Sequence, residues 1–205
     1  MNTKNKIRIG IISGTVLAAL AITGIAFADD SAAWTTLNVS GKLSDSLKLE
    51  LEESFRFSDV GDPSLARQHT DLSASWSAND RFTAVGGYRN TSLGEHRLYI
   101  GVDVALFSLG KIDFGNETRL DLRDWDTPRG RSKVSVATEV AGLSPYVTDE
   151  VFVGEDGFLE NRATVGVSKS LNEMFSVGAY YMLATALVDE AAHTHVMGLD
   201  FGVSL

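Results

Sequence analysis

Apolar and polar residues alternate along Ser46–Ser58, whose sequence is SLKLELEESFRFS. Only Glu53 breaks the alternation. Because successive side chains of a strand point to opposite faces, the pattern predicts a strand with one apolar face and one charged face. The run is long enough for a tilted membrane-spanning strand, which needs roughly 9–11 residues. Its polar face carries both charge signs at mid-strand, which suits the lumen of a transmembrane barrel.

The same alternation recurs along the chain and predicts eleven segments. They are residues 34–43, 46–58, 69–78, 81–89, 97–106, 112–123, 132–141, 146–153, 162–168, 175–187 and 196–205. A bacterial single-chain barrel has an even number of strands. We therefore expect either that the first segment does not span, which leaves ten strands, or that one strand is missing, which gives twelve. In the eighth segment Glu150 shares a face with Tyr146 and Phe152, while Asp149 lies among valines, which indicates a bulge.

A soluble barrel or sandwich would alternate equally well, but the connections and the chain end favour a membrane barrel. Connections alternate between brief and longer ones, as periplasmic turns and outer loops do. The brief connections follow Leu43, Ala78, Leu106, Ala141 and Ser168, and the longer ones follow Ser58, Arg89, Arg123, Val153 and Leu187. The chain also ends inside an alternating strand, at Leu205, as expected of a strand that signals barrel assembly.

Aromatic residues near the predicted strand ends suit the two interfacial girdles of a membrane barrel. They are Trp34, Phe57, Trp76, Tyr88, Phe107, Trp125, Tyr146 and Phe175. The fold class predicted is therefore all-β, an antiparallel up-and-down transmembrane β-barrel of 10–12 strands.

The first residues have the three parts of a secretory signal peptide. Lys4, Lys6 and Arg8 precede the apolar run Ile9–Ile25, and an A-x-A site ends at Ala28. The alternative is a single anchoring helix, for which the apolar run is short. We expect a signal peptide over 1–28, cleaved after Ala28, and one barrel domain over 29–205 in the bacterial outer membrane.

Composition narrows the partners. The net charge is −9 and there is no cysteine. An acidic chain without a basic run argues against nucleic acid as a partner, and no disulfide can hold the fold. The expected partners are outer-membrane lipid, the barrel-assembly machinery through the C-terminal strand, and small solutes.

Several stretches together resemble the DUF2490 family. They are Trp34 followed by GKLSDSLKLELEESFRF, GYRN at Gly87–Asn90, ETRLDLR at Glu117–Arg123, PYVTDEVF at Pro145–Phe152, ENRATVGV at Glu160–Val167, and YYM with HTHVMGL near the end. The resemblance covers nearly the whole chain after residue 28. It implies a Gram-negative outer-membrane β-barrel of unknown function, with no established functional residues to carry over. Segment 132–141 departs from an arginine-rich pattern because its only basic residue is Lys133.

Charged residues on the polar faces are the candidate functional residues. We expect a lumen charge network of Glu52, Arg56, Arg89, Arg97, Asp103, Glu117, Arg119, Asp121, Arg123, Glu139, Glu150 and Arg162. Arginine–carboxylate pairs could brace a plugged lumen, or they could form a selective path, because charged rings set selectivity in pores. The hypothesis is a narrow pore for small solutes. The alternative is a structural or interaction barrel with a plugged lumen.

Enzymatic and metal sites are not indicated. His69, Asp71 and Ser73 share a strand face, but residues two apart on a strand lie about 6.5–7 Å apart, too far for a direct proton relay. A lipid-modifying enzyme is therefore the least supported reading. His193 and His195 are weak candidates for a metal site, because no third ligand has matching spacing. We expect no cofactor and no catalytic residue.

Overall fold

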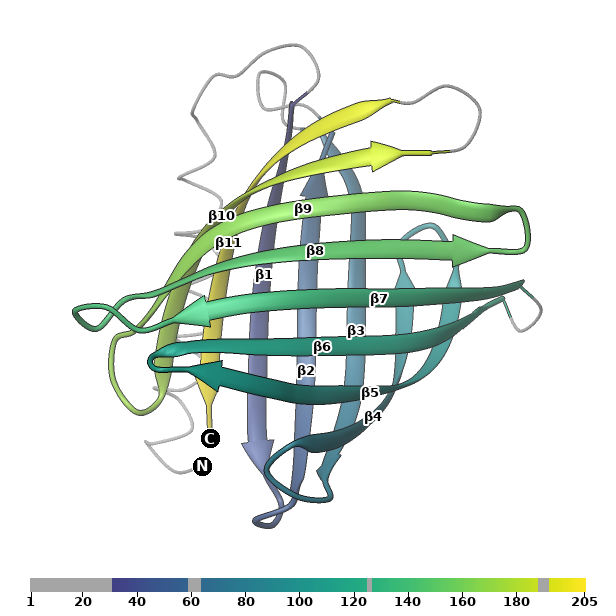
Figure 1. The fold of residues 1–205 in the computed structure, drawn as a ribbon. Helices are drawn as coiled ribbons and strands as arrows, with labels where there is room; N and C mark the ends of the chain where they lie inside the picture. The colour runs from purple at the N-terminus through teal and green to yellow at the C-terminus, as the bar shows by residue number, and fades with distance from the viewer. Residues whose placement is uncertain (1–30, 59–63, 125–126, 188–191) are drawn as a thin grey trace, which may run out of the picture.

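The computed structural model describes residues 31–58, 64–124, 127–187 and 192–205. In these ranges the chain forms eleven strands that close into one barrel (Figure 1). They are β1 (Ser31–Lys42), β2 (Leu47–Phe57), β3 (Leu65–Ser77), β4 (Phe82–Thr91), β5 (His96–Leu109), β6 (Ile112–Arg123), β7 (Thr127–Thr138), β8 (Ser144–Gly154), β9 (Gly157–Ser170), β10 (Phe175–Ala186) and β11 (His193–Ser204). All eleven predicted segments are strands, which confirms the predicted all-β barrel.

The barrel closes between the first and last strands. Consecutive strands pair antiparallel, whereas β1 and β11 pair in parallel from Ser31–His195 to Ser40–Ser204. The expectation of ten or twelve strands is therefore wrong for the described residues. An odd number of up-and-down strands brings β1 and β11 side by side in the same direction, so the closing pair must be parallel. Leu205 extends this seam, since its N–H donates to Ser40 O at 2.8 Å.

The two ends of the barrel are named here by their connections. The turn end carries residues 43–46, 78–81, 110–111, 139–143 and 171–174, and the loop end carries 58–64, 92–95, 124–126, 155–156 and 187–192. The predicted alternation of brief and longer connections holds between β2 and β3 and between β10 and β11, but it fails between β4 and β5, between β6 and β7 and between β8 and β9, where the connections are no longer than most of those at the turn end. In the last case β9 begins at Gly157, because Gly157 adopts a positive φ of 99° that permits a tight turn. Similarly, β7 begins at Thr127, so the predicted loop Trp125–Arg131 lies largely in a strand.

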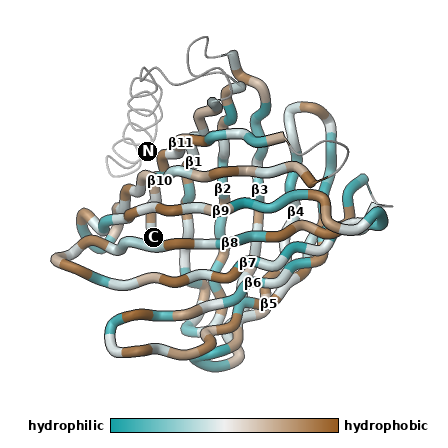
Figure 2. The backbone as a smooth tube through the Cα atoms, turned by 45° about the horizontal axis from the view of Figure 1, so that its top comes forward, coloured by the Kyte–Doolittle hydropathy of each residue, from teal (hydrophilic) through white to brown (hydrophobic). Residues whose placement is uncertain are grey.

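Hydrophobic and hydrophilic residues alternate along many of the strands (Figure 2), so the two faces of the wall differ in chemistry. Apolar side chains cover the outside; Ile100 is 67% exposed and Leu72 55% exposed. The predicted girdle residues Trp76, Tyr88 and Phe107 are exposed on this outer face. Such an apolar wall fits contact with lipid rather than water.

Two predicted girdle residues point into the lumen instead. Trp34 packs against the guanidinium of Arg56, and Tyr146 lines an internal cavity. Trp125 and the predicted signal peptide lie outside the described residues. Within the described ranges, no helix is long and apolar enough to cross a membrane.

Candidate functional site

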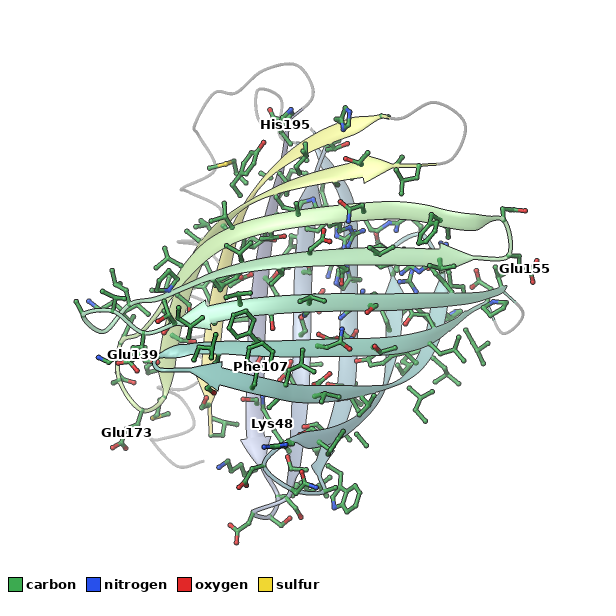
Figure 3. All side chains as sticks on the ribbon, in the orientation of Figure 1. Lys48, Phe107, Glu139, Glu155, Glu173 and His195 are labelled. Atoms are coloured by element: carbon green, nitrogen blue, oxygen red, sulfur yellow. The ribbon has the colours of Figure 1, made fainter. Side chains whose placement is uncertain are left out.

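Arginines from seven strands converge on one cavity inside the barrel, toward the loop end. The cavity measures about 130 Å³. The arginines that line it, called here the arginine layer, are Arg56, Arg67, Arg89, Arg97, Arg119, Arg123, Arg129, Arg131 and Arg162. Alternation explains the convergence, because each arginine occupies a lumen-facing position of its strand. Side chains of this kind fill the interior of the barrel in Figure 3.

Glu117 contacts three cationic side chains, two of which belong to the arginine layer. Its Oε1 lies 2.5 Å from Arg119 Nε and also contacts Arg131 Nη2, and its Oε2 lies 2.5 Å from Lys133 Nζ. Arg131 reaches onward to Glu150, with Nε 3.0 Å from Oε1. Glu117 thus links β6 to β7, and Glu150 extends the chain of ion pairs to β8.

Asp71 on β3 binds side chains from the next two strands, β4 and β5. The side chain is only 4% exposed. Arg89 Nε donates to its Oδ2 at 2.7 Å, and the Tyr99 hydroxyl donates to its Oδ1 at 2.5 Å. Both oxygens of a buried carboxylate are thus satisfied, as buried charge requires.

Asp121 and Glu95 hold the arginines nearest the loop end. Asp121 Oδ2 accepts from Arg129 at 3.1 Å and from Arg97 at 3.4 Å. Glu95, in the loop before β5, accepts two 3.0 Å hydrogen bonds from Arg123 and one from Arg97. Burial alone would raise the pKa of Glu95, but these hydrogen bonds lower it to about 2. Glu95 is therefore ionised at neutral pH and holds Arg97 and Arg123 at the loop end of the barrel.

Phe152 lines the same cavity as the arginine layer. The ring is 1% exposed, and the guanidinium carbons of Arg129 and Arg162 each lie 4.5 Å from its centroid. A guanidinium over an aromatic face gains a cation–π attraction. The ring therefore narrows the lumen where two cations flank it.

A wider vestibule occupies the rest of the lumen. It measures about 620 Å³ and shares Arg162 with the arginine cavity. Its lining is mostly polar, with Asn38, Glu50, Thr148 and Asp200 among the residues. The lumen thus consists of a polar vestibule that meets a small, arginine-lined constriction.

Tyrosines in this lumen lie opposite glycines on the adjacent strand. The pairs are Tyr99 with Gly87, Tyr146 with Gly166, and Tyr180 with Gly198. A methyl group on Gly198 would lie 1.9 Å from the Tyr180 ring, so the ring lies flat against the wall only because that position has no side chain. Flat rings leave the vestibule open.

We expect Gly198→Ala to narrow the vestibule. The added carbon would displace the Tyr180 ring, whose only free direction is the lumen, while the barrel stays folded because the clash is with a side chain. Gly178→Ala is the matched control, since its added carbon would find no atom closer than 3.5 Å. The measurement is solute uptake into liposomes. Uptake that falls in neither variant would show that the ring position does not set the width.

The structure brings most of the predicted charge network together. Glu52, Arg89, Arg97, Glu117, Arg119, Asp121, Arg123, Glu150 and Arg162 form ion pairs. Arg56 and Asp103 lie among them, but neither has an ion-pair partner in the described ranges. Glu139 does not belong to the network: β7 ends at Thr138, and Glu139 is exposed at the turn end (Figure 3).

Sequence reasoning missed several members of the site. Arg129 and Arg131 were expected in a loop because Pro128 and Gly130 are turn residues. Pro128 is tolerated because β7 starts to pair with β8 only at Gly130. In the sequence, Phe152 falls on the same strand face as Glu150. This alternation is the signal that could have identified Phe152 as a lumen residue. The register does shift between Phe152 and Val153, yet Tyr146, Glu150 and Phe152 all face inward.

The remaining candidate residues have other contacts. His69 lies 3.3 Å from Glu52, and Asp71 binds Arg89 and Tyr99, so neither is directed at Ser73. His193 contacts Thr185, and His195 contacts Tyr181. No group of three metal-ligating side chains occurs in the part of the chain that the structure describes.

Comparisons with known proteins give a family and one similar fold. The family model for proteins of unknown function DUF2490 matches residues 31–190. No curated protein matches the chain. Among solved structures, a KdgM porin in complex with disordered oligogalacturonate is similar, with a TM-score of 0.51 at 12% sequence identity, over 79% of this chain and 87% of the porin. At this identity the likeness concerns the fold, which is that of a porin barrel.

Proposed function

The chain belongs to the DUF2490 family, whose name assigns no activity, and we propose that it forms a narrow pore for small solutes in the bacterial outer membrane. The observation that carries the proposal is a closed barrel whose apolar outer wall surrounds a polar vestibule and an arginine-lined cavity. Arg162 lines both cavities, which are therefore neighbours in the lumen, and we infer that they form one path through it.

The proposed pore would have to be exported and inserted into the outer membrane. An N-terminal signal peptide removed after Ala28 would deliver the chain across the inner membrane. The C-terminal strand β11, paired on both sides in the closed barrel, would be the segment that the assembly machinery recognises. Outer-membrane lipid would then cover the exposed apolar wall.

The lumen chemistry supports passage of charged or polar solutes. A lumen ring of fixed charges selects permeating ions by sign, and here the constriction is lined by arginines with carboxylates behind them. The similar porin was solved with oligogalacturonate, an anionic ligand, which is consistent with an arginine-lined path in a barrel of this fold. We infer no catalytic role for these residues.

The second candidate is a structural or interaction barrel with a braced lumen. Its support is the ion pairs that link neighbouring strands, such as Glu150 with Arg131 and Arg162. A brace and a filter respond differently to loss of one lumen charge, so the two can be separated.

Arg119→Ala separates them. Arg119 lines the constriction, pairs with Glu117 at 2.5 Å, and lies 4.7 Å from the Tyr99 ring centroid. For a pore, we expect the zero-current potential in a salt gradient to shift toward cation permeation, because one positive charge leaves the narrowest region.

The control is Arg81→Ala, which removes an exposed arginine at the turn end. It should leave the zero-current potential unchanged. If Arg119→Ala lowers the unfolding temperature but leaves ion selectivity as in the wild type, the network is a brace and does not act as a selectivity filter.

A further inference from the structure

Two arginines of the arginine layer differ from the other seven. Arg89, Arg97, Arg119, Arg123, Arg129, Arg131 and Arg162 each lie within ion-pair distance of a carboxylate. Arg56 and Arg67 have no carboxylate within 4.0 Å among the described residues. Within the part of the chain that the structure describes, no ion pair therefore offsets these two positive charges.

These two arginines face each other across neighbouring strands. Arg56 on β2 is directly opposite Arg67 on β3 in the ladder, and both line the same cavity. Side chains directly opposite each other in an antiparallel pair have Cβ atoms about 4.5–5.5 Å apart, and like charges there are destabilising. An anion between the two guanidinium groups would offset this repulsion.

The orientation of Arg56 is fixed by an aromatic ring. Its guanidinium carbon lies 3.9 Å from the centroid of the Trp34 ring. The ring occupies a face of the guanidinium and leaves its N–H edges available, which are the groups that bind oxyanions in a bidentate manner.

Arg56 also has an unsatisfied donor. Its Nε is buried and has no hydrogen-bond partner within the described residues, as is true of Nε in Arg97, Arg119, Arg129 and Arg131, but Arg56 alone of these five has no ion-pair partner there either. A buried polar atom without a partner indicates a missing ligand, water or ion. His69 and Thr91, both at most 5% exposed, complete the polar lining on the same side.

We propose that Arg56 and Arg67 form a binding site for an oxyanion, the carboxylate or phosphate group of a solute in the lumen. The inference rests on the proposed pore, because the pore brings solute to the site. Arg56 donates from a position held by Trp34, and Arg67 donates from the adjacent strand. The bound anion offsets the repulsion between the two guanidinium groups.

The test is equilibrium binding to the detergent-solubilised barrel. Trp34 reports on the site through its fluorescence once Trp76→Phe and Trp125→Phe remove the other tryptophans. Sodium acetate and sodium phosphate are titrated separately, so that the two sources of an oxyanion are distinguished. We expect a saturable change with at least one of them.

Arg67→Glu is the decisive variant. The introduced carboxylate would pair with Arg56, so the barrel should fold. Because this carboxylate would occupy the position of the bound oxyanion, binding of acetate or phosphate should weaken about tenfold or more. Arg67→Gln, which removes the charge without replacing it, should weaken binding similarly. Arg81→Glu, at the exposed turn end, should bind like the wild type. Unchanged binding in Arg67→Glu or Arg67→Gln would overturn the site.

Conductance of the same preparations separates the site from the pore. Arg67-dependent binding in a barrel that does not conduct would support the site and refute the pore. Conductance without Arg67-dependent binding would refute the site and leave the pore intact.

Discussion

Replacing Glu117 with glutamine is expected to lower the free energy of unfolding by about 3–5 kcal/mol, because it removes the carboxylate that pairs with Arg119 and Lys133 inside the barrel. Glu117 contacts Arg119, Arg131 and Lys133, and its side chain is only 12% exposed. Glutamine keeps the shape but removes the charge. The measurement is urea unfolding of the reconstituted barrel, followed by tryptophan fluorescence and by heat-modified mobility on gels.

Two further variants identify the cause of that loss. Glu139→Gln removes an equally charged but exposed residue and should change stability by less than about 0.5 kcal/mol. Lys133→Met in the Glu117→Gln background should recover part of the loss, since removing both partners of a pair is milder than removing one. A Glu117→Gln barrel as stable as the wild type would show that Glu117 does not hold the network together.

Phe152→Ala is expected to widen the constriction and to destabilise the barrel together. The ring is 1% exposed and lies between the guanidinium groups of Arg129 and Arg162. Removal of a buried phenylalanine side chain costs about 3–5 kcal/mol. The same removal opens the narrowest part of the path, so single-channel conductance should rise.

The effects of volume and of the aromatic face can be separated at this position. Phe152→Leu keeps most of the volume, so its conductance should stay near that of the wild type, while the loss of two cation–π contacts lowers stability. Phe158→Ala removes a ring that is 65% exposed on the outer wall and should leave conductance unchanged. Equal conductance in Phe152→Ala and the wild type would mean that Phe152 does not limit the path.

The strands were predictable because a strand has a period of two and the two faces of this wall meet different surroundings. Each predicted segment overlaps one observed strand, and most predicted lumen charges do face the lumen. Boundaries were less predictable. Alternation runs on through Glu139, one residue beyond the end of β7, because sequence period alone does not show where pairing stops.

The parallel seam could not be predicted, since no local signal specifies which strand closes a barrel. The pairing of β1 with β11 depends on residues far apart in sequence, such as Trp34 opposite Gly198. The rule of even strand number therefore led to the wrong count. The sequence alone does not show why position 198 is a glycine. The reason is that the Tyr180 ring lies against it, and this contact depends on the register between β10 and β11.

The sequence also did not predict which arginines have no ion-pair partner among the described residues. Arg56 was expected among ion pairs because it shares the polar face of its strand with carboxylates such as Glu52. In the barrel, Glu53 faces outward and accepts from Gln68 and Thr70 at 2.8 Å, and Glu52 turns to His69. The neighbour opposite Arg56 is Arg67, from a stretch that reads as a loop.

Single-channel recording of residues 29–205 in a planar bilayer tests the central claim most directly. The account predicts steady current steps whose size depends on salt concentration, because the vestibule and the arginine layer form one path. Silence from protein that has demonstrably inserted would contradict the claim, and would show that the arginine layer closes the lumen.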